Sequence, residues 1–135
     1  MYPYSKQDYV RMANKNIVIC LIDDSIAVGS LFKAFYENQE IILDYFTSYQ
    51  EFVKNRRPHY DIIIYDWNLS SNSEKTGKIL IEETKNEFKH KIIHTGMSDQ
   101  AGEIVRYAVE NKILYVSKNH ENNIFDEINR LITYI

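Results

Sequence analysis

The sequence predicts an α/β protein with a five-stranded parallel sheet that is doubly wound, so that helices cover both of its faces. Five short apolar runs alternate strictly with five longer segments of helical spacing, which is the pattern of repeated β-α units. Runs such as IVICLI and DIIIY are apolar along almost their whole length, as in strands buried on both sides. Five strands in about 120 residues fit the flavodoxin-like strand order 2-1-3-4-5.

The predicted strands are short and rich in β-branched residues. They span residues 17–22, 41–46, 61–65, 91–94 and 114–116. The predicted helices span residues 25–38, 49–56, 76–88, 99–110 and 121–134. Apolar residues at helical spacing are expected to face the core, among them Val28, Leu31, Phe32, Phe35, Phe52, Val53, Ile79, Leu80, Ile104 and Val105.

Composition narrows the classes of protein that remain. The 135 residues suffice for one domain, and a net charge of −3 argues against a broad nucleic-acid or membrane surface. The single cysteine, Cys20, excludes an internal disulfide, and no apolar run approaches the ~18 residues of a membrane span. Residues 1–15 lack the apolar core of a secretory signal and are expected to form an N-terminal extension to a domain at 16–135. We therefore expect a cytoplasmic protein.

Polar residues follow four of the predicted strands. Asp23 and Asp24 end the first strand, Asp66 ends the third, Thr95 follows the fourth and Lys118 follows the fifth. In a doubly wound sheet, binding and catalytic groups lie beyond the carboxyl ends of the strands, where the strand order reverses. We therefore expect three carboxylates, a hydroxyl and an ammonium group in one crevice.

The expected charges of this crevice indicate a divalent cation. Two carboxylates about 5 Å apart repel by roughly 3 kcal/mol at an effective dielectric constant of ~20, and Lys118 offsets only one of three negative charges. Either one carboxylate stays protonated or a cation binds, and oxygen ligands with room for water suit Mg²⁺. Such a site is suited to an anion with several oxygens, of which a phosphoryl group is the obvious candidate, with Asp66 as its nucleophilic acceptor.

The sequence at these strand ends resembles the receiver domain of two-component response regulators, in particular the single-domain, chemotaxis (CheY-like) type. The matching pieces are LIDDS at 21–25, DIIIYDWN at 61–68, HTGMS at 94–98 and YVSK at 115–118. Each piece alone is weak, but the four occur in the right order and each lies at a strand end. The resemblance covers residues 17–135.

The resemblance implies that Asp66 accepts a phosphoryl group from the phosphohistidine of a sensor histidine kinase or phosphotransfer protein. It implies that Asp24 binds Mg²⁺ directly, that Asp23 assists through water, and that Asp66 and the backbone carbonyl of Asn68 complete the protein ligands.

The resemblance also assigns a conformational switch. Thr95 and Lys118 would contact phosphoryl oxygens, and Tyr115 occupies the aromatic switch position. Thr95 would move toward the phosphoryl group, Tyr115 would turn inward, and the surface of the fourth helix, fifth strand and fifth helix would change for a downstream protein target. A phosphorylation-dependent dimer is a further partner, whereas direct nucleic-acid or membrane binding is not expected. If the chain is complete, we expect output to pass through a protein partner or a further phosphotransfer step; if it is part of a longer protein, an output domain could follow Ile135.

The sequence departs from the receiver pattern at three positions. Asn119 stands where a proline usually follows the lysine, so we expect a trans peptide bond there. Ser70 replaces a proline in the loop after the third strand, and this loop is a few residues longer than usual before Gly77. Met97 is also expected at the border of the site.

Other interpretations remain open at this stage. The chain could be a receiver-like interaction module that is not phosphorylated, and Tyr115 could be a permanently buried strand residue. A magnesium-dependent phosphotransferase or phosphatase is disfavoured because Asn68 stands where such enzymes need a second carboxylate. A flavin carrier is disfavoured because the first strand is followed by two aspartates rather than a phosphate-binding loop. We therefore expect a signalling module rather than a metabolic enzyme, with Trp67 partly exposed beside the site.

Overall fold

The computed structural model describes residues 16–69, 73–96, 101–119 and 123–135. Its strands are β1 (Ile17–Ile22), β2 (Ile41–Phe46), β3 (Ile62–Tyr65), β4 (His90–Thr95) and β5 (Leu114–Ser117). Its helices are α2 (Ile26–Tyr36), α3 (Tyr49–Asn55), α4 (Gly77–Thr84), α5 (Ala101–Glu110) and α6 (Asn123–Ile132). The extension expected over residues 1–15 lies outside the described residues, as do Ser70 and Met97.

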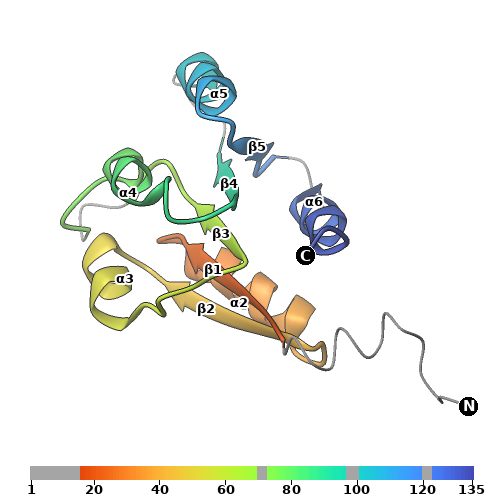
Figure 1. Cartoon of the computed structure of the whole chain (residues 1–135). Helices are drawn as coiled ribbons and strands as arrows, with labels where there is room; N and C mark the ends of the chain where they lie inside the picture. The colour runs from red at the N-terminus through yellow and green to blue at the C-terminus, as the bar shows by residue number, and fades with distance from the viewer. Residues whose placement is uncertain (1–15, 70–72, 97–100, 120–122) are drawn as a thin grey trace, which may run out of the picture.

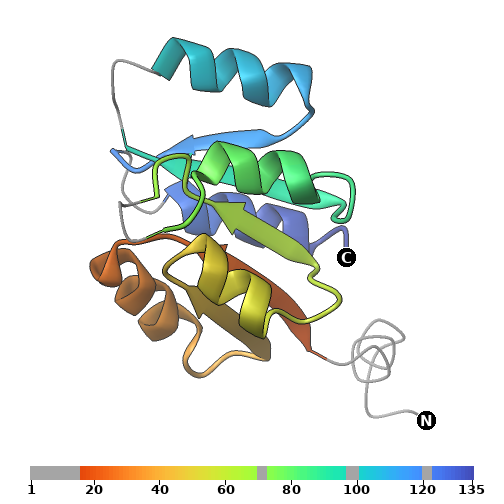
Figure 2. The ribbon, with the colours of Figure 1, turned by 90° about the vertical axis from the view of Figure 1, so that its left-hand side faces the viewer.

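The five strands form one parallel sheet in the order β2-β1-β3-β4-β5, which confirms the predicted fold class. Figure 1 shows α3, α4 and α5 on one face of this sheet and α2 and α6 on the other. In Figure 2 the strands are seen from the side, and their carboxyl ends lie together at the left. Among the described residues, no helix is both long and apolar enough to cross a bilayer.

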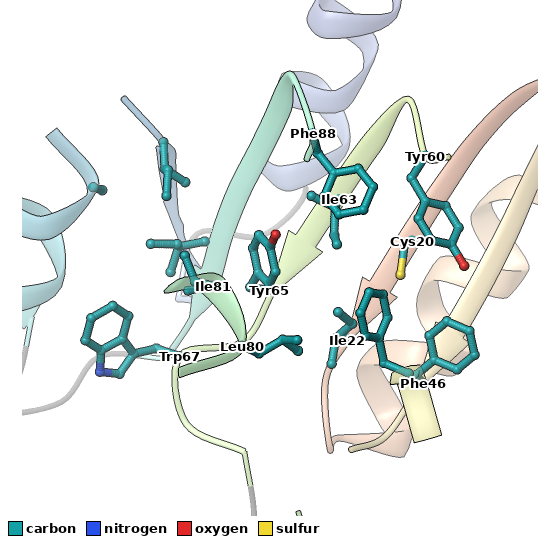
Figure 3. Packing of buried hydrophobic residues seen from close by; sticks show 14 of the residues in the cluster. Cys20, Ile22, Phe46, Tyr60, Ile63, Tyr65, Trp67, Leu80, Ile81 and Phe88 are labelled. Atoms are coloured by element: carbon teal, nitrogen blue, oxygen red, sulfur yellow. The ribbon is translucent and has the colours of Figure 1, made fainter. Parts of the chain in front are cut away.

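Alternation along β1 divides its side chains between two cores. Cys20 and Ile22 point into the cluster beneath α3, α4 and α5, which Figure 3 shows, whereas Ile19 and Leu21 point into the cluster beneath α2 and α6. All four side chains have no exposed surface. The central strands are therefore covered on both faces, which explains why their sequences are continuously apolar.

Helices α2, α3, α4 and α6 are shorter than predicted, and several side chains expected in the core lie outward. In α2 the buried residues are Gly29, Phe32 and Tyr36, whereas Leu31 is 55% exposed. Phe35 is 38% exposed and stacks on Phe125 of α6, with ring centroids 4.0 Å apart. A helix lying on a sheet buries only one narrow stripe, so an apolar residue beside that stripe stays at the surface. The same holds for three further predicted core residues, which are exposed: Val53, Ile79 and Val105.

Candidate functional site

Three aspartates converge where the central strands β1 and β3 end. Asp23 has no exposed surface, Asp66 is 4% exposed and Asp24 is half-buried. One carboxylate oxygen from each lies within 4.8 Å of the other two. The adjacent, parallel pairing of β1 and β3 brings these residues together although 42 positions separate Asp24 from Asp66.

Lys118 supplies the positive charge among these carboxylates. Its Nζ lies 2.8 Å from Oδ2 of Asp23 and 3.3 Å from Oδ2 of Asp66. The backbone N–H of Lys118 donates to the carbonyl of Thr95, which fixes the end of β5 to the end of β4. No cis peptide bond occurs among the described residues, so Lys118 reaches both aspartates with the expected trans bond to Asn119.

The carboxylate of Asp66 is also held by two hydrogen-bond donors on its other oxygen. The hydroxyl of Thr95, which is 2% exposed, donates to Oδ1 at 2.8 Å. The backbone N–H of Asn68 donates to the same oxygen at 3.3 Å. Asp66 is therefore oriented by Thr95 at the end of β4, by Lys118 directly after β5 and by the backbone of its own loop.

Burial raises the pKa of Asp66 to about 6, and the nearby charge of Asp23 adds to this effect. Lys118 and Thr95 act in the opposite direction because they stabilise the carboxylate. Burial opposes the charge on Lys118, but its contacts with Asp23 and Asp66 outweigh burial and raise its pKa. The site therefore holds more negative charge than its own lysine neutralises.

The donor set fits a hard divalent cation. Oδ2 of Asp23 is buried, and its partner among the described residues is the ammonium of Lys118 at 2.8 Å. Carboxylate oxygens from Asp23, Asp24 and Asp66, with the half-buried Asp24 open to solvent, suit the octahedral, partly hydrated coordination of Mg²⁺.

Gly77, the first residue of α4, was not predicted to shape the site, but the structure places it directly against the backbone that carries Asp66. A methyl group at this position would overlap the carbonyl of Asp66 and lie 2.6 Å from the carbonyl oxygen of Trp67. Thr76 caps the helix there by accepting a hydrogen bond from the N–H of Ile79. A glycine at a helix start is common, so the sequence alone carried little signal for this close approach.

Two aromatic residues near the site, Trp67 and Tyr115, are both largely covered by neighbouring side chains. Trp67 is only 4% exposed, so the prediction of a partly exposed indole was wrong. Its ring packs edge-on against Tyr107 of α5, with centroids 5.2 Å apart, and Lys78 of α4 lies over it. Tyr115 is half-buried against the core beneath α5, and its hydroxyl is buried without a hydrogen-bond partner among the described residues.

Comparison with known proteins identifies the fold. No protein-family model matches the chain, and no curated protein matches its sequence. Among solved structures, a CheY-like response regulator receiver domain from Methanospirillum hungatei JF-1 has a TM-score of 0.72 and 18% identity, over 88% of this chain and 96% of that one. A two-component response regulator from Clostridium difficile has a TM-score of 0.70 and 18% identity, over 87% and 97% of the two chains.

A longer protein matches in the same way. The response regulator DrrB of Thermotoga maritima, an OmpR/PhoB homolog, has a TM-score of 0.68 and 21% identity over 88% of this chain, which spans 54% of DrrB. At these identities the likeness concerns the fold. The chain therefore has the fold of response regulator receiver domains.

Proposed function

We propose that this protein is a phosphoacceptor signalling module of a two-component system, modified on Asp66 by a histidine kinase or phosphotransfer protein in the presence of Mg²⁺. The observation that carries the proposal is the environment of the Asp66 carboxylate. Thr95 holds one of its oxygens, Lys118 lies by the other, and two further aspartates adjoin it. The receiver fold supports the same conclusion.

In the proposed reaction, an oxygen of Asp66 forms a bond to phosphorus while the bond between phosphorus and the kinase histidine nitrogen breaks. Asp23, Asp24, Asp66 and the carbonyl of Asn68 would hold Mg²⁺. The bound ion would supply positive charge that offsets the carboxylates and the phosphoryl oxygens. The ammonium of Lys118 and the hydroxyl of Thr95 would each bind a phosphoryl oxygen. Both groups already contact the carboxylate of Asp66, to which the phosphoryl group would be attached.

The proposed switch begins at the same contacts. When Asp66 becomes an acyl phosphate, Thr95 exchanges its bond to Oδ1 for one to a phosphoryl oxygen, and Tyr115, which is already half-buried, turns further inward. The surface of α5, β5 and α6 then changes for a downstream protein target. This surface exposes apolar side chains that suit a protein partner, since Val109 is 73% exposed and Leu114 is 37% exposed. The protein acts in the cytoplasm as a signalling module and not as a metabolic enzyme.

The test is the mass of the purified chain after incubation with Mg²⁺ and a small-molecule phosphodonor. We expect a gain of one phosphoryl group that disappears with a chelator and in Asp66→Asn. Asp126→Asn, an exposed aspartate on α6, serves as the matched control and should be modified like the wild type. No gain in the wild type would overturn the proposal in favour of a receiver-like interaction module that is not phosphorylated.

A further inference from the structure

The end of the edge strand β2 holds the turn that carries Asp23 and Asp24. The carbonyl of Phe46 accepts a hydrogen bond from the backbone N–H of Asp23 at 3.0 Å. The hydroxyl of the preceding residue, Tyr45, donates to the carbonyl of Ser25, also at 3.0 Å. Two successive residues of β2 thus bind the two ends of a three-residue turn.

We propose that Tyr45 is a positioning residue for the cation site, which it serves by fixing the Asp23–Ser25 turn through the carbonyl of Ser25. The inference rests on the proposed function, because it concerns the Mg²⁺ site of that function. It assigns a role to a residue of the edge strand that contributes no ligand itself.

Ser25 transmits the restraint because it is bound at both ends of its own backbone. Its N–H donates to Oδ1 of Asp23 at 2.8 Å, while its carbonyl accepts both the hydroxyl of Tyr45 and the N–H of Gly29. Its side chain caps α2 by accepting from the N–H of Val28. Without the bond from Tyr45, the carbonyl keeps only its helical partner, and the turn that orients the Asp23 carboxylate loses its link to the side chains of β2.

The structure around Tyr45 keeps its hydroxyl on this carbonyl. The ring lies directly over Gly29, where a methyl group would overlap it, so glycine is needed for the ring to approach the first turn of α2. Lys33 places its Nζ 5.4 Å from the ring centroid. Burial, and then the charges of Asp23, Asp24 and Glu51, raise the pKa of Tyr45 to about 12, so the hydroxyl remains a hydrogen-bond donor at neutral pH.

The test compares Tyr45→Phe with Tyr36→Phe. Both substitutions remove one phenol hydroxyl from a tyrosine that contacts the core beneath α2, but the hydroxyl of Tyr36 has no hydrogen-bond partner among the described residues. Mg²⁺ affinity is measured by calorimetry and by Trp67 fluorescence, and backbone amide exchange at residues 23–25 is measured without Mg²⁺. We expect Tyr45→Phe to weaken Mg²⁺ binding roughly fivefold, the worth of one ordinary hydrogen bond, and to speed exchange in the turn. Tyr36→Phe should change neither.

The other outcomes separate an error in the role of Tyr45 from an error in the proposed function. If the wild type binds Mg²⁺ and Tyr45→Phe binds it equally well, the role of Tyr45 is overturned while the proposed function stands. If the wild type binds no Mg²⁺, the proposed cation site is wrong. Amide exchange then tests only whether Tyr45 restrains the turn at residues 23–25. Unchanged exchange in the turn would overturn the restraint as well, whereas faster exchange confined to Tyr45→Phe would support it.

Discussion

Lys118 reaches from the end of β5 to Asp23 at the end of β1, with its Nζ 2.8 Å from a carboxylate that has no exposed surface. Strands β3 and β4 lie between the two, so the contact spans the carboxyl end of the sheet. Without a bound cation, Lys118 is the positive group that offsets the buried charges of Asp23 and Asp66. The lysine therefore contributes to stability as well as to the proposed chemistry.

Lys118→Met should destabilise the protein in the absence of Mg²⁺, because it leaves buried carboxylates without a counter-charge. Loss of one partner of a buried pair costs ~3–5 kcal/mol, and the partial exposure of Lys118 lowers our expectation to about 2 kcal/mol. Mg²⁺ should raise the melting temperature of the variant more than that of the wild type. The control in thermal denaturation is Lys89→Met, which removes an exposed lysine directly before the amino end of β4, far from the site. Equal unfolding of both variants would contradict the assigned role.

Mg²⁺ binding should weaken as the pH falls below about 6, where Asp66 takes up a proton. A proton and a cation compete for the same oxygens, so affinity should drop by up to roughly tenfold per pH unit below that value. Calorimetric titrations from about pH 5 to about pH 8 follow this competition. In Asp66→Asn the remaining binding should lose this dependence, and a profile shared by both proteins would exclude Asp66 as its source.

His94 should make the fold less stable in mild acid. Burial, followed by the charge of Lys118, lowers its pKa from 6.5 to about 4, so between these values the unfolded chain binds a proton that the folded chain does not. Stability is therefore lost as the pH falls through this window, by up to about 3 kcal/mol. Asp66 has the opposite effect, since its pKa is raised in the folded state.

The contribution of His94 is isolated by comparing the wild type with His94→Phe in urea denaturation at each pH. Phenylalanine keeps a ring beside Phe32, whose centroid lies 6.2 Å from that of His94. The variant should gain stability relative to the wild type as the pH falls from 6.5 to about 4. A constant difference between the two proteins would show that His94 is not the group responsible.

Gly77→Ala should both destabilise the fold and impair modification of Asp66. The added methyl group would overlap the Asp66 carbonyl, so the acceptor loop or the start of α4 must shift, at a cost of about 1–3 kcal/mol. Gly102→Ala is the control because a side chain there meets nothing within 4 Å, and replacing an exposed helical glycine by alanine stabilises by ~0.5–1 kcal/mol. We expect the urea midpoint to fall in Gly77→Ala and to rise in Gly102→Ala. Equal shifts in the two variants would refute the close approach of Gly77 to the carbonyl of Asp66.

The sheet could be predicted from the sequence more fully than the helices. The bounds of β1 and β2 match the prediction because continuous β-branched runs end at polar residues. The buried stripe of α2 was partly misplaced, since Leu31 and Phe35 fit a helical period as well as Phe32 does. Which of several apolar stripes meets the sheet depends on how the helix lies across the strands, and local spacing does not contain that information.

The same distinction applies to the site. The sequence was sufficient to predict that Asp23, Asp66 and Lys118 lie close together, because a parallel sheet places the carboxyl ends of all its strands at one rim. The burial of Trp67 depends on Tyr107, 40 positions further along the chain, and so has no local signature. Likewise, nothing in the sequence indicates that the ring of Tyr45 lies on Gly29.

A sheet whose strands all run in one direction gives the molecule two unlike rims. The rim at the carboxyl ends of the strands carries Asp66 and its neighbours. The opposite rim carries contacts that support the fold, such as the hydrogen bond that the carboxylate of Asp61 accepts from the N–H of Val18. Six-residue strands separate the rims by about 20 Å. Insertions, tags or surface attachment points engineered into the second rim should therefore leave the surroundings of Asp66 undisturbed, which makes the second rim the practical place to attach this protein to a sensor surface.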